Sequence, residues 1–543
     1  MAMKLVVFSI LLPDLICCAR KFPPGFRFGS ATSSYQVEGA WNVSDKTASI
    51  WDTFSHSNPS KVTGHATGDI ACDSYFRWKD DINVAAELGL HFYRFSIAWP
   101  RLLPTGFVDK ISEDGKNYYN ALIDGLLERG IEPVVTLYHW ELPQRIQNLG
   151  GFANAYVVDW FADYARVAFT LFGDRVKTWI TINEPLLACD VAYNTGNIAP
   201  GIRDPEFANY LCAKHMLLAH AKAWRIYDEE FRHMYHGKIG LTNQLIWFEE
   251  DSPEDADIAE RVRQYVAGIY SHPIYTKTGG WPPELEQIIA ENSKRQGYAR
   301  SRLPPFTQEE IDLIKGTYDF YGLNYYTSRI VRKAKDDDVF GNWPLGNGAV
   351  ELGAVMSVRP EWKRGASSWF WSNAPGLRQK LKWLKKNYGD MEIFITENGF
   401  STFSSRLDDE DRVQYFKSHL EQVWLAITED GVNVTGYTAW SMIDNFEWVD
   451  GYDVKFGLYY VDMKDESRTR VPRASAKYYA NVIRTHSLDV ASKYNSQLYS
   501  TVLFYAPLPI VLVVIFLLIF SCPKYAKIFT TTHHRLLNTP DMF

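Results

Sequence analysis

Cysteines and basic clusters are scarce in this sequence, and each scarcity excludes a class of protein. Only six cysteines occur among 543 residues, and none has the Cys/His spacing of a zinc site. Cysteine chemistry therefore does not build this fold. Cys72, Cys189 and Cys212 lie in the central part of the chain, where an odd number permits at most one disulfide and leaves its pairing open. The net charge is −7 and no long basic run occurs, which disfavours nucleic acid as a partner.

The amino terminus has the pattern of a secretory signal peptide. Lys4 supplies a positive charge, residues 5–12 are apolar, and cleavage could follow Ala19. We therefore predict a signal peptide over residues 1–19, and an ordinary amino terminus is the alternative. Asn42 and Asn433 each begin an Asn-X-Ser/Thr triplet, and we expect both to accept glycans in the secretory pathway.

A second apolar segment lies near the carboxyl terminus. Residues 502–520 carry no charge and form a segment long enough to span a bilayer as a helix. Lys524, Lys527 and Arg535 follow, which places the carboxyl terminus in the cytosol. We expect a stalk over residues 486–500, a transmembrane helix over 502–522 and a cytoplasmic tail over 523–543. The protein would then be a type I single-pass membrane protein of the endoplasmic reticulum or plasma membrane, and a buried soluble helix is the alternative.

Short β-branched or aromatic segments alternate with longer amphipathic segments between residues 22 and 485. This order is typical of a parallel sheet with crossover helices. Strands are predicted at residues 26–31, 92–98, 133–138, 178–182, 239–245, 320–325, 393–396 and 434–440. Eight strands close an α/β fold of the (β/α)8 TIM-barrel type as one large domain. Helices are expected at 78–88 and 155–172, and a long loop at 333–364.

Two short motifs indicate the chemistry. Residues 181–185 read Thr-Ile-Asn-Glu-Pro and residues 395–399 read Ile-Thr-Glu-Asn-Gly. Each places a glutamate, Glu184 or Glu397, at the carboxyl end of a predicted strand, where active sites of such barrels lie. Two carboxyl groups facing one bond are the equipment of a glycoside hydrolase.

These motifs belong to a longer series of matches in which the chain resembles family 1 glycoside hydrolases. The other matching segments are residues 29–40 (GSATSSYQVEGA), 93–101 (YRFSIAWPR), 138–144 (YHWELPQ) and 440–448 (WSMIDNFEW). Together with the predicted signal peptide and membrane anchor, they resemble the animal members close to lactase-phlorizin hydrolase and the lactase-like proteins. The resemblance covers nearly all of residues 22–483.

The resemblance implies a retaining β-glycosidase that acts on terminal β-linked glucosides or galactosides. Glu397 matches the nucleophile and Glu184 the acid/base. Arg94, Asn324 and Tyr326 match the residues that orient the nucleophile, and Trp369 resembles the aglycone platform. The sugar-binding positions are matched by Gln36, His139, Asn183, Tyr326, Trp440, Glu447 and Trp448. The substrate would be a small β-glycoside, an oligosaccharide or a glycolipid.

Two other functions remain open at this stage. A klotho-like co-receptor or carbohydrate-binding ectodomain would use the same fold without catalysis, but such relatives have lost a catalytic carboxylate, whereas Glu184 and Glu397 are both present. Transglycosylation would use the same residues with an alcohol in place of water. No metal or organic cofactor is implied, because the two carboxyl groups suffice.

Overall fold

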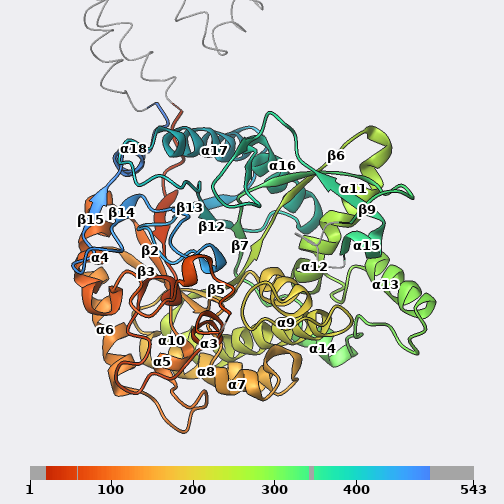
Figure 1. Ribbon diagram of the computed structural model, residues 1–543, viewed down its shortest axis with the longest axis horizontal. Coiled ribbons are helices and arrows are strands. Elements are labelled where there is room, and N and C mark those ends of the chain that lie inside the picture. Colours follow the sequence, from red (N-terminus) through yellow and green to blue (C-terminus); the bar gives the residue numbers. More distant parts are fainter. Residues whose placement is uncertain (1–19, 58, 341–347, 490–543) are drawn as a thin grey trace, which may run out of the picture. The chain divides into compact units, whose positions relative to one another are not determined.

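Eight parallel strands form a closed barrel in the computed structural model, which describes residues 20–57, 59–340 and 348–489 (Figure 1). Around the barrel the order is β1-β13-β12-β7-β5-β4-β3-β2. The strands are β1 (Arg27–Ala31), β2 (Phe92–Ser96), β3 (Glu132–Tyr138), β4 (Thr178–Asn183), β5 (Lys238–Gln244), β7 (Phe320–Asn324), β12 (Ile393–Asn398) and β13 (Val434–Trp440). Because β1 pairs with both β2 and β13, the sheet has no free edge. The predicted (β/α)8 barrel is confirmed.

Each predicted strand overlaps one barrel strand, and the ends differ by at most two residues. β13 has the predicted bounds. β12 continues to Asn398, so Glu397 lies within the strand. β4 ends at Asn183, and Glu184 is the residue that follows.

Helices surround the barrel (Figure 1). The longer ones are α4 (Ser74–Leu88), α6 (Glu113–Glu128), α8 (Val157–Phe172), α9 (Ala208–Ile226), α13 (Pro283–Arg295), α16 (Ala374–Tyr388), α17 (Glu410–Thr428) and α18 (Ala474–Thr485). The shorter ones include α2 (Ser34–Val37), α3 (Ile50–Ser55), α5 (Trp99–Leu102), α7 (Gln144–Asn148), α10 (Arg232–Tyr235), α11 (Ala256–Arg263), α12 (Ile269–Tyr275), α14 (Gln308–Ile314) and α15 (Gly348–Leu352). The two helices predicted at 78–88 and 155–172 correspond to α4 and α8.

Apolar side chains fill the barrel near the amino ends of its strands. Phe92, Val134, Ile180, Phe320 and Phe394 form one buried cluster. The rings of Phe92 and Phe394 meet edge to face with centroids 5.1 Å apart. This packed layer closes the amino end of the barrel, and a polar site can therefore form only at the carboxyl end.

The prediction of a long loop at residues 333–364 is wrong in part. β9 (Ala354–Ser357) pairs antiparallel with β8 (Ser328–Lys333), which also pairs with β6 (Trp247–Glu250). Two smaller sheets join β10 (Lys363–Arg364) to β11 (Trp371–Ser372) and β14 (Tyr459–Val461) to β15 (Arg470–Pro472). A four-residue strand is too short for a clear alternating pattern.

The structure resolves the cysteine pairing that the sequence left open. Cys189 and Cys212 form a disulfide. Cys72 is a buried free thiol whose Sγ donates to the backbone oxygen of Asp444 at 2.9 Å.

The ends of the described chain form a small unit of their own, distinct from residues 23–484. Lys21 and Ser487 form an antiparallel bridge, and Arg20 pairs with Asp489 at 2.7 Å. None of the described helices combines the length and apolar character needed to cross a bilayer. The predicted signal peptide (1–19), transmembrane helix (502–522), tail (523–543) and most of the stalk (486–500) lie outside the described residues.

Candidate active site

A cavity of about 530 Å³ lies at the carboxyl end of the barrel. Both candidate catalytic carboxyl groups, Glu184 and Glu397, line it, together with His139, Tyr326 and Trp440. These five residues lie at or just after the ends of five different strands. The fold therefore brings together two motifs that are far apart along the chain.

Two donors hold the two oxygens of Glu397. Arg94 donates from Nη1 to Oε1 at 2.6 Å, and the Tyr326 hydroxyl donates to Oε2 at 2.8 Å. Arg94 is itself fully buried, and its Nη2 donates to Oδ1 of Asn183 at 2.7 Å. The carboxyl group is thus fixed in orientation by groups that stabilise its ionised form.

Glu184 is held differently. Its Oε1 accepts a hydrogen bond from Nδ2 of Asn324 at 2.8 Å. Asn324, which the resemblance matches to the residues that orient Glu397, thus also binds the second carboxyl group. The backbone of Glu184 has a φ of 50°, in the left-handed region, and its N–H donates to the backbone oxygen of Thr242 at 2.8 Å.

The surroundings of the two carboxyl groups shift their pKa values unequally. Burial raises the pKa of Glu184 well above its usual range, and the nearby charge of Glu397 raises it further. Burial also raises the pKa of Glu397, but Arg94, Tyr326 and Asn324 oppose this shift. When two close carboxyl groups share one proton, this arrangement places it on Glu184 and leaves Glu397 ionised.

His139 lies close to two tryptophan rings and is neutral. Its ring stacks near Trp440 and Trp448, with centroids 5.7 and 6.1 Å away. Burial and the charge of Arg94 lower its pKa well below the usual range. Nδ2 of Asn183 lies 3.2 Å from Nε2, so the ring proton belongs on Nδ1. That buried Nδ1 has no partner among the described residues and remains available to a ligand hydroxyl.

Gln36 and Glu447 form a polar pair beside this aromatic group. Nε2 of Gln36 donates to Oε2 of Glu447 at 3.4 Å and to Oδ1 of Asn445 at 3.1 Å. Burial raises the pKa of Glu447 well above its usual range, and the acidic groups Asp450, Glu397 and Glu184 add to the shift. The pair supplies hydrogen-bonding groups to a polar ligand that is shielded from water.

Another part of the cavity wall is apolar. Leu187, Val191 and Ile198 come from the segment after β4, and Trp369 and Phe456 come from other loops. The ring of Trp369 meets that of Tyr326 edge to face, with centroids 5.8 Å apart. A ligand group held here would exchange water for hydrocarbon surface.

Five polar cavity residues were missed by the sequence analysis: Asn197, Gln244, Arg329, Ser368 and Asp450. Gln244 is the last residue of β5, so the rule that sites gather at strand ends could have found it. Oε1 of Gln244 is buried and has no partner in the described part of the chain. Arg329 donates to the backbone oxygen of Trp369 at 2.6 Å, a contact that no local pattern predicts.

The two predicted glycosylation residues, Asn42 and Asn433, are exposed, and neither lines the cavity. A second hollow of about 620 Å³ lies on the outside of the barrel, beside α8, α9 and α14. Several of its charged groups pair with one another or with neighbours, as Lys222 does with Asp159. It therefore has the character of a solvated helix surface. Within residues 20–57, 59–340 and 348–489, no cluster of His, Cys, Asp and Glu could hold a metal.

Comparisons with known proteins agree with this geometry. A family model described as Glycosyl hydrolase family 1 matches residues 18–488. The chain is 42% identical to Myrosinase 1 of Brevicoryne brassicae over 469 residues. This alignment covers 86% of this chain and 99% of the myrosinase. The chain is 40% identical over 472 residues to human Lactase-like protein, covering 85% and 82% of the two chains. A solved β-glucosidase from Humicola insolens in complex with glucose has a TM-score of 0.79 and 35% identity, covering 86% and 98%.

Proposed function

This chain belongs to glycosyl hydrolase family 1, and we propose that it hydrolyses terminal β-linked glucosides or galactosides with retention of anomeric configuration. One observation carries the proposal. Glu184 and Glu397 line one cavity, both are buried, and their partners favour a proton on Glu184 and a charge on Glu397. A retaining mechanism needs this division between an acid and a nucleophile.

In the first step, an oxygen of Glu397 attacks the anomeric carbon and forms a covalent glycosyl ester. The glycosidic oxygen leaves with the bonding electrons and takes the proton of Glu184. Arg94 and Tyr326 hold the attacking carboxylate in position throughout. Retention requires the two carboxyl groups to be roughly 5–5.5 Å apart, close enough for direct attack.

In the second step, Glu184 acts as a base instead of an acid. Its carboxylate removes a proton from a water molecule, whose oxygen attacks the anomeric carbon. The bond to Glu397 breaks, and the sugar leaves with its original configuration. Glu184 is then protonated again, so the cycle consumes only water.

The polar half of the cavity suits the terminal sugar. His139 offers a donor at Nδ1, and Gln36 and Glu447 offer further hydrogen-bonding groups. The indole of Trp440 supplies a flat apolar surface against which a sugar ring can stack. The glucose complex of the Humicola insolens enzyme supports a hexose as the ligand.

We assign the leaving group to the apolar half of the cavity. Leu187, Val191 and Ile198 face this space together with Trp369 and Phe456. Burying apolar surface contributes about 25 cal/mol for each Å². An alkyl or aryl aglycone, including that of a glycolipid, therefore fits this wall better than a second free sugar.

We also propose that the protein enters the secretory pathway and remains anchored by one carboxyl-terminal span, as a type I membrane protein. The Cys189–Cys212 disulfide supports this proposal, because disulfides persist in oxidising compartments. The exposure of Asn42 and Asn433 is compatible with glycosylation there.

A mechanism-based label tests the proposed function. The purified protein is incubated with a 2-deoxy-2-fluoro-β-glycosyl fluoride, which forms a slowly hydrolysed glycosyl-enzyme. Peptide mass spectrometry should locate the sugar on Glu397, and the Glu397→Gln variant should carry no label. A label on another residue would overturn the assignment of Glu397. The absence of both label and turnover of aryl β-glycosides would favour the non-catalytic co-receptor.

A further inference from the structure

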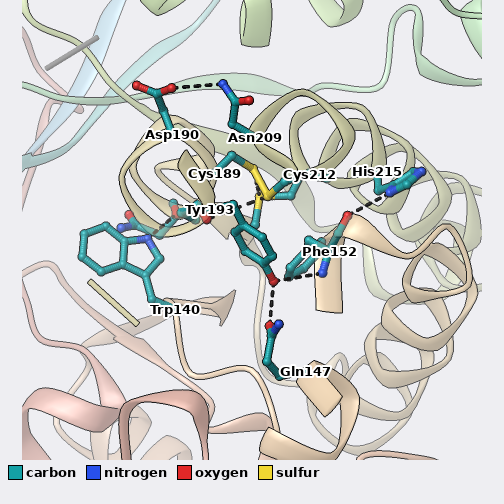
Figure 2. The surroundings of a disulfide bond; sticks show 12 residues. Trp140, Gln147, Phe152, Cys189, Asp190, Tyr193, Asn209, Cys212 and His215 are labelled. Atoms are coloured by element: carbon teal, nitrogen blue, oxygen red, sulfur yellow. Dashed lines mark hydrogen bonds between the residues drawn. A yellow bond between two sulfur atoms is a disulfide. The ribbon is translucent and has the colours of Figure 1, made fainter. Parts of the chain in front are cut away.

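The segment after Glu184 forms an unusual helix with two distinct faces. η3 (Leu187–Thr195) is a π-helix, a rare conformation that often marks functional sites. Leu187 and Val191 line the cavity. Cys189, which is buried on this helix, instead joins Cys212 of α9 (Figure 2).

Further contacts hold η3 to α9 and to residues 147–152. Oδ1 of Asp190 accepts a hydrogen bond from Nδ2 of Asn209 at 3.1 Å, beside the disulfide (Figure 2). The Tyr193 hydroxyl donates to Oε1 of Gln147 at 2.7 Å and accepts from the N–H of Phe152 at 3.1 Å. Among these links only the disulfide is covalent.

The position of η3 is transmitted directly to Glu184. The backbone oxygen of Glu184 accepts hydrogen bonds from the N–H groups of Leu187 and Ala188, both at 3.1 Å. Glu184 also has a left-handed backbone, which persists in a residue other than glycine only when its surroundings hold it there. Thr242 holds it on one side and η3 on the other.

We propose that the Cys189–Cys212 disulfide is a positioning element for catalysis, which keeps Glu184 and the apolar face of η3 in place against the leaving group. This inference rests on the proposed hydrolase function. Neither cysteine lines the cavity, so the disulfide would act through the backbone of η3. Residues on other strands, including Glu397, do not depend on it.

The test compares two leaving groups in a variant that lacks the disulfide. Hydrolysis of octyl β-glycosides needs the proton of Glu184 and contact with η3. In Cys189→Ala/Cys212→Ala, the kcat/KM for these substrates should fall on the order of tenfold, as expected for a displaced general acid. A dinitrophenyl β-glycoside leaves without protonation, so its kcat/KM should change by no more than about twofold. The rate at which the fluoroglycosyl fluoride labels Glu397 should also be unchanged.

Leu285→Ala provides a control for lost stability. Leu285 is fully buried in α13 and does not line the cavity. This variant should lower the melting temperature without changing the ratio of the two kcat/KM values. Non-reducing peptide mapping of the wild-type chain should recover the peptides of Cys189 and Cys212 as one linked species.

Three outcomes would overturn the inference: unlinked peptides in the wild type, equal losses on both substrates, or no loss on either. If the wild-type chain hydrolyses neither glycoside, the proposed function itself fails. The two failures are therefore distinguishable.

Discussion

At the scale of single residues, Glu397 depends on two donors of different kinds. Arg94 supplies a full positive charge at Oε1, and Tyr326 supplies a neutral hydroxyl at Oε2. Both lower the pKa of Glu397 against the opposing effect of burial. Because the nucleophile must be ionised, the acid limb of the pH–rate profile reports how well these donors work.

Removing the Tyr326 hydroxyl should move that acid limb. In Tyr326→Phe the ionised form of Glu397 loses a donor, so its pKa rises and the acid limb of kcat/KM shifts to higher pH. Activity is then lost earlier as the pH falls. At the optimum, kcat/KM should decrease on the order of 10- to 100-fold, the equivalent of one hydrogen bond to a charged group. The pH dependence of kcat/KM on an aryl β-glycoside measures both effects.

The neighbouring Tyr325 offers a matched control. Its buried hydroxyl donates to the backbone oxygen of Asn373 at 2.7 Å and does not contact a carboxyl group. Tyr325→Phe should therefore leave the acid limb in place. An unmoved limb in Tyr326→Phe would show that its hydroxyl does not set the ionisation of Glu397.

At the scale of elements, one position in the pairing of β1 with β2 has space for a side chain on only one of the two strands. Gly29 lies opposite Phe92 in this register. A Cβ atom added to Gly29 would lie 2.2 Å from Cε2 of Phe92, whose ring belongs to the apolar cluster at the amino end of the barrel. The absence of a side chain at Gly29 thus leaves the space that the ring of Phe92 fills.

Gly29→Ala should destabilise the barrel by overpacking. We expect a loss of about 1–3 kcal/mol in the free energy of unfolding, measured by urea denaturation. Phe92→Leu alone also costs stability, but it removes the ring that the new methyl group meets. The double variant should therefore lose less than the sum of the two single losses. Additive losses would mean that the two side chains do not compete for the same space.

The elements also show which features a sequence can predict. Most barrel strands are rich in β-branched and aromatic residues, and all eight were predicted within two residues. The role of strand ends was equally predictable, because Glu184 and Glu397 follow such runs directly. β9 and the Cys189–Cys212 pairing were not, because each depends on a partner brought close only by the fold. Asn324 was matched to the cavity, but its hydrogen bond to Glu184 was not foreseen.

At the scale of the whole molecule, neither predicted glycosylation residue lines the catalytic cavity. Asn433 immediately precedes β13, at the amino end of the barrel, whereas the cavity lies at the carboxyl end. Asn42 is exposed and does not line the cavity. A glycan at Asn433 would therefore lie at the opposite end of the barrel from the cavity. We expect removal of either acceptor residue to leave activity unchanged, because neither lines the cavity.

The proposed topology predicts that the full chain produced in animal cells carries N-linked glycans. Endoglycosidase treatment should increase its gel mobility, and Asn42→Gln or Asn433→Gln should each remove one glycan. Asn148→Gln is the matched control, because Asn148 is exposed but begins no acceptor triplet. An epitope placed after Phe543 should be digested by protease added to sealed microsomes, while the barrel stays protected, because only the tail faces the cytosol. A chain without glycans that fractionates with cytosolic proteins would refute both the secretory route and the type I orientation, and it would leave the buried disulfide without an oxidising compartment to maintain it.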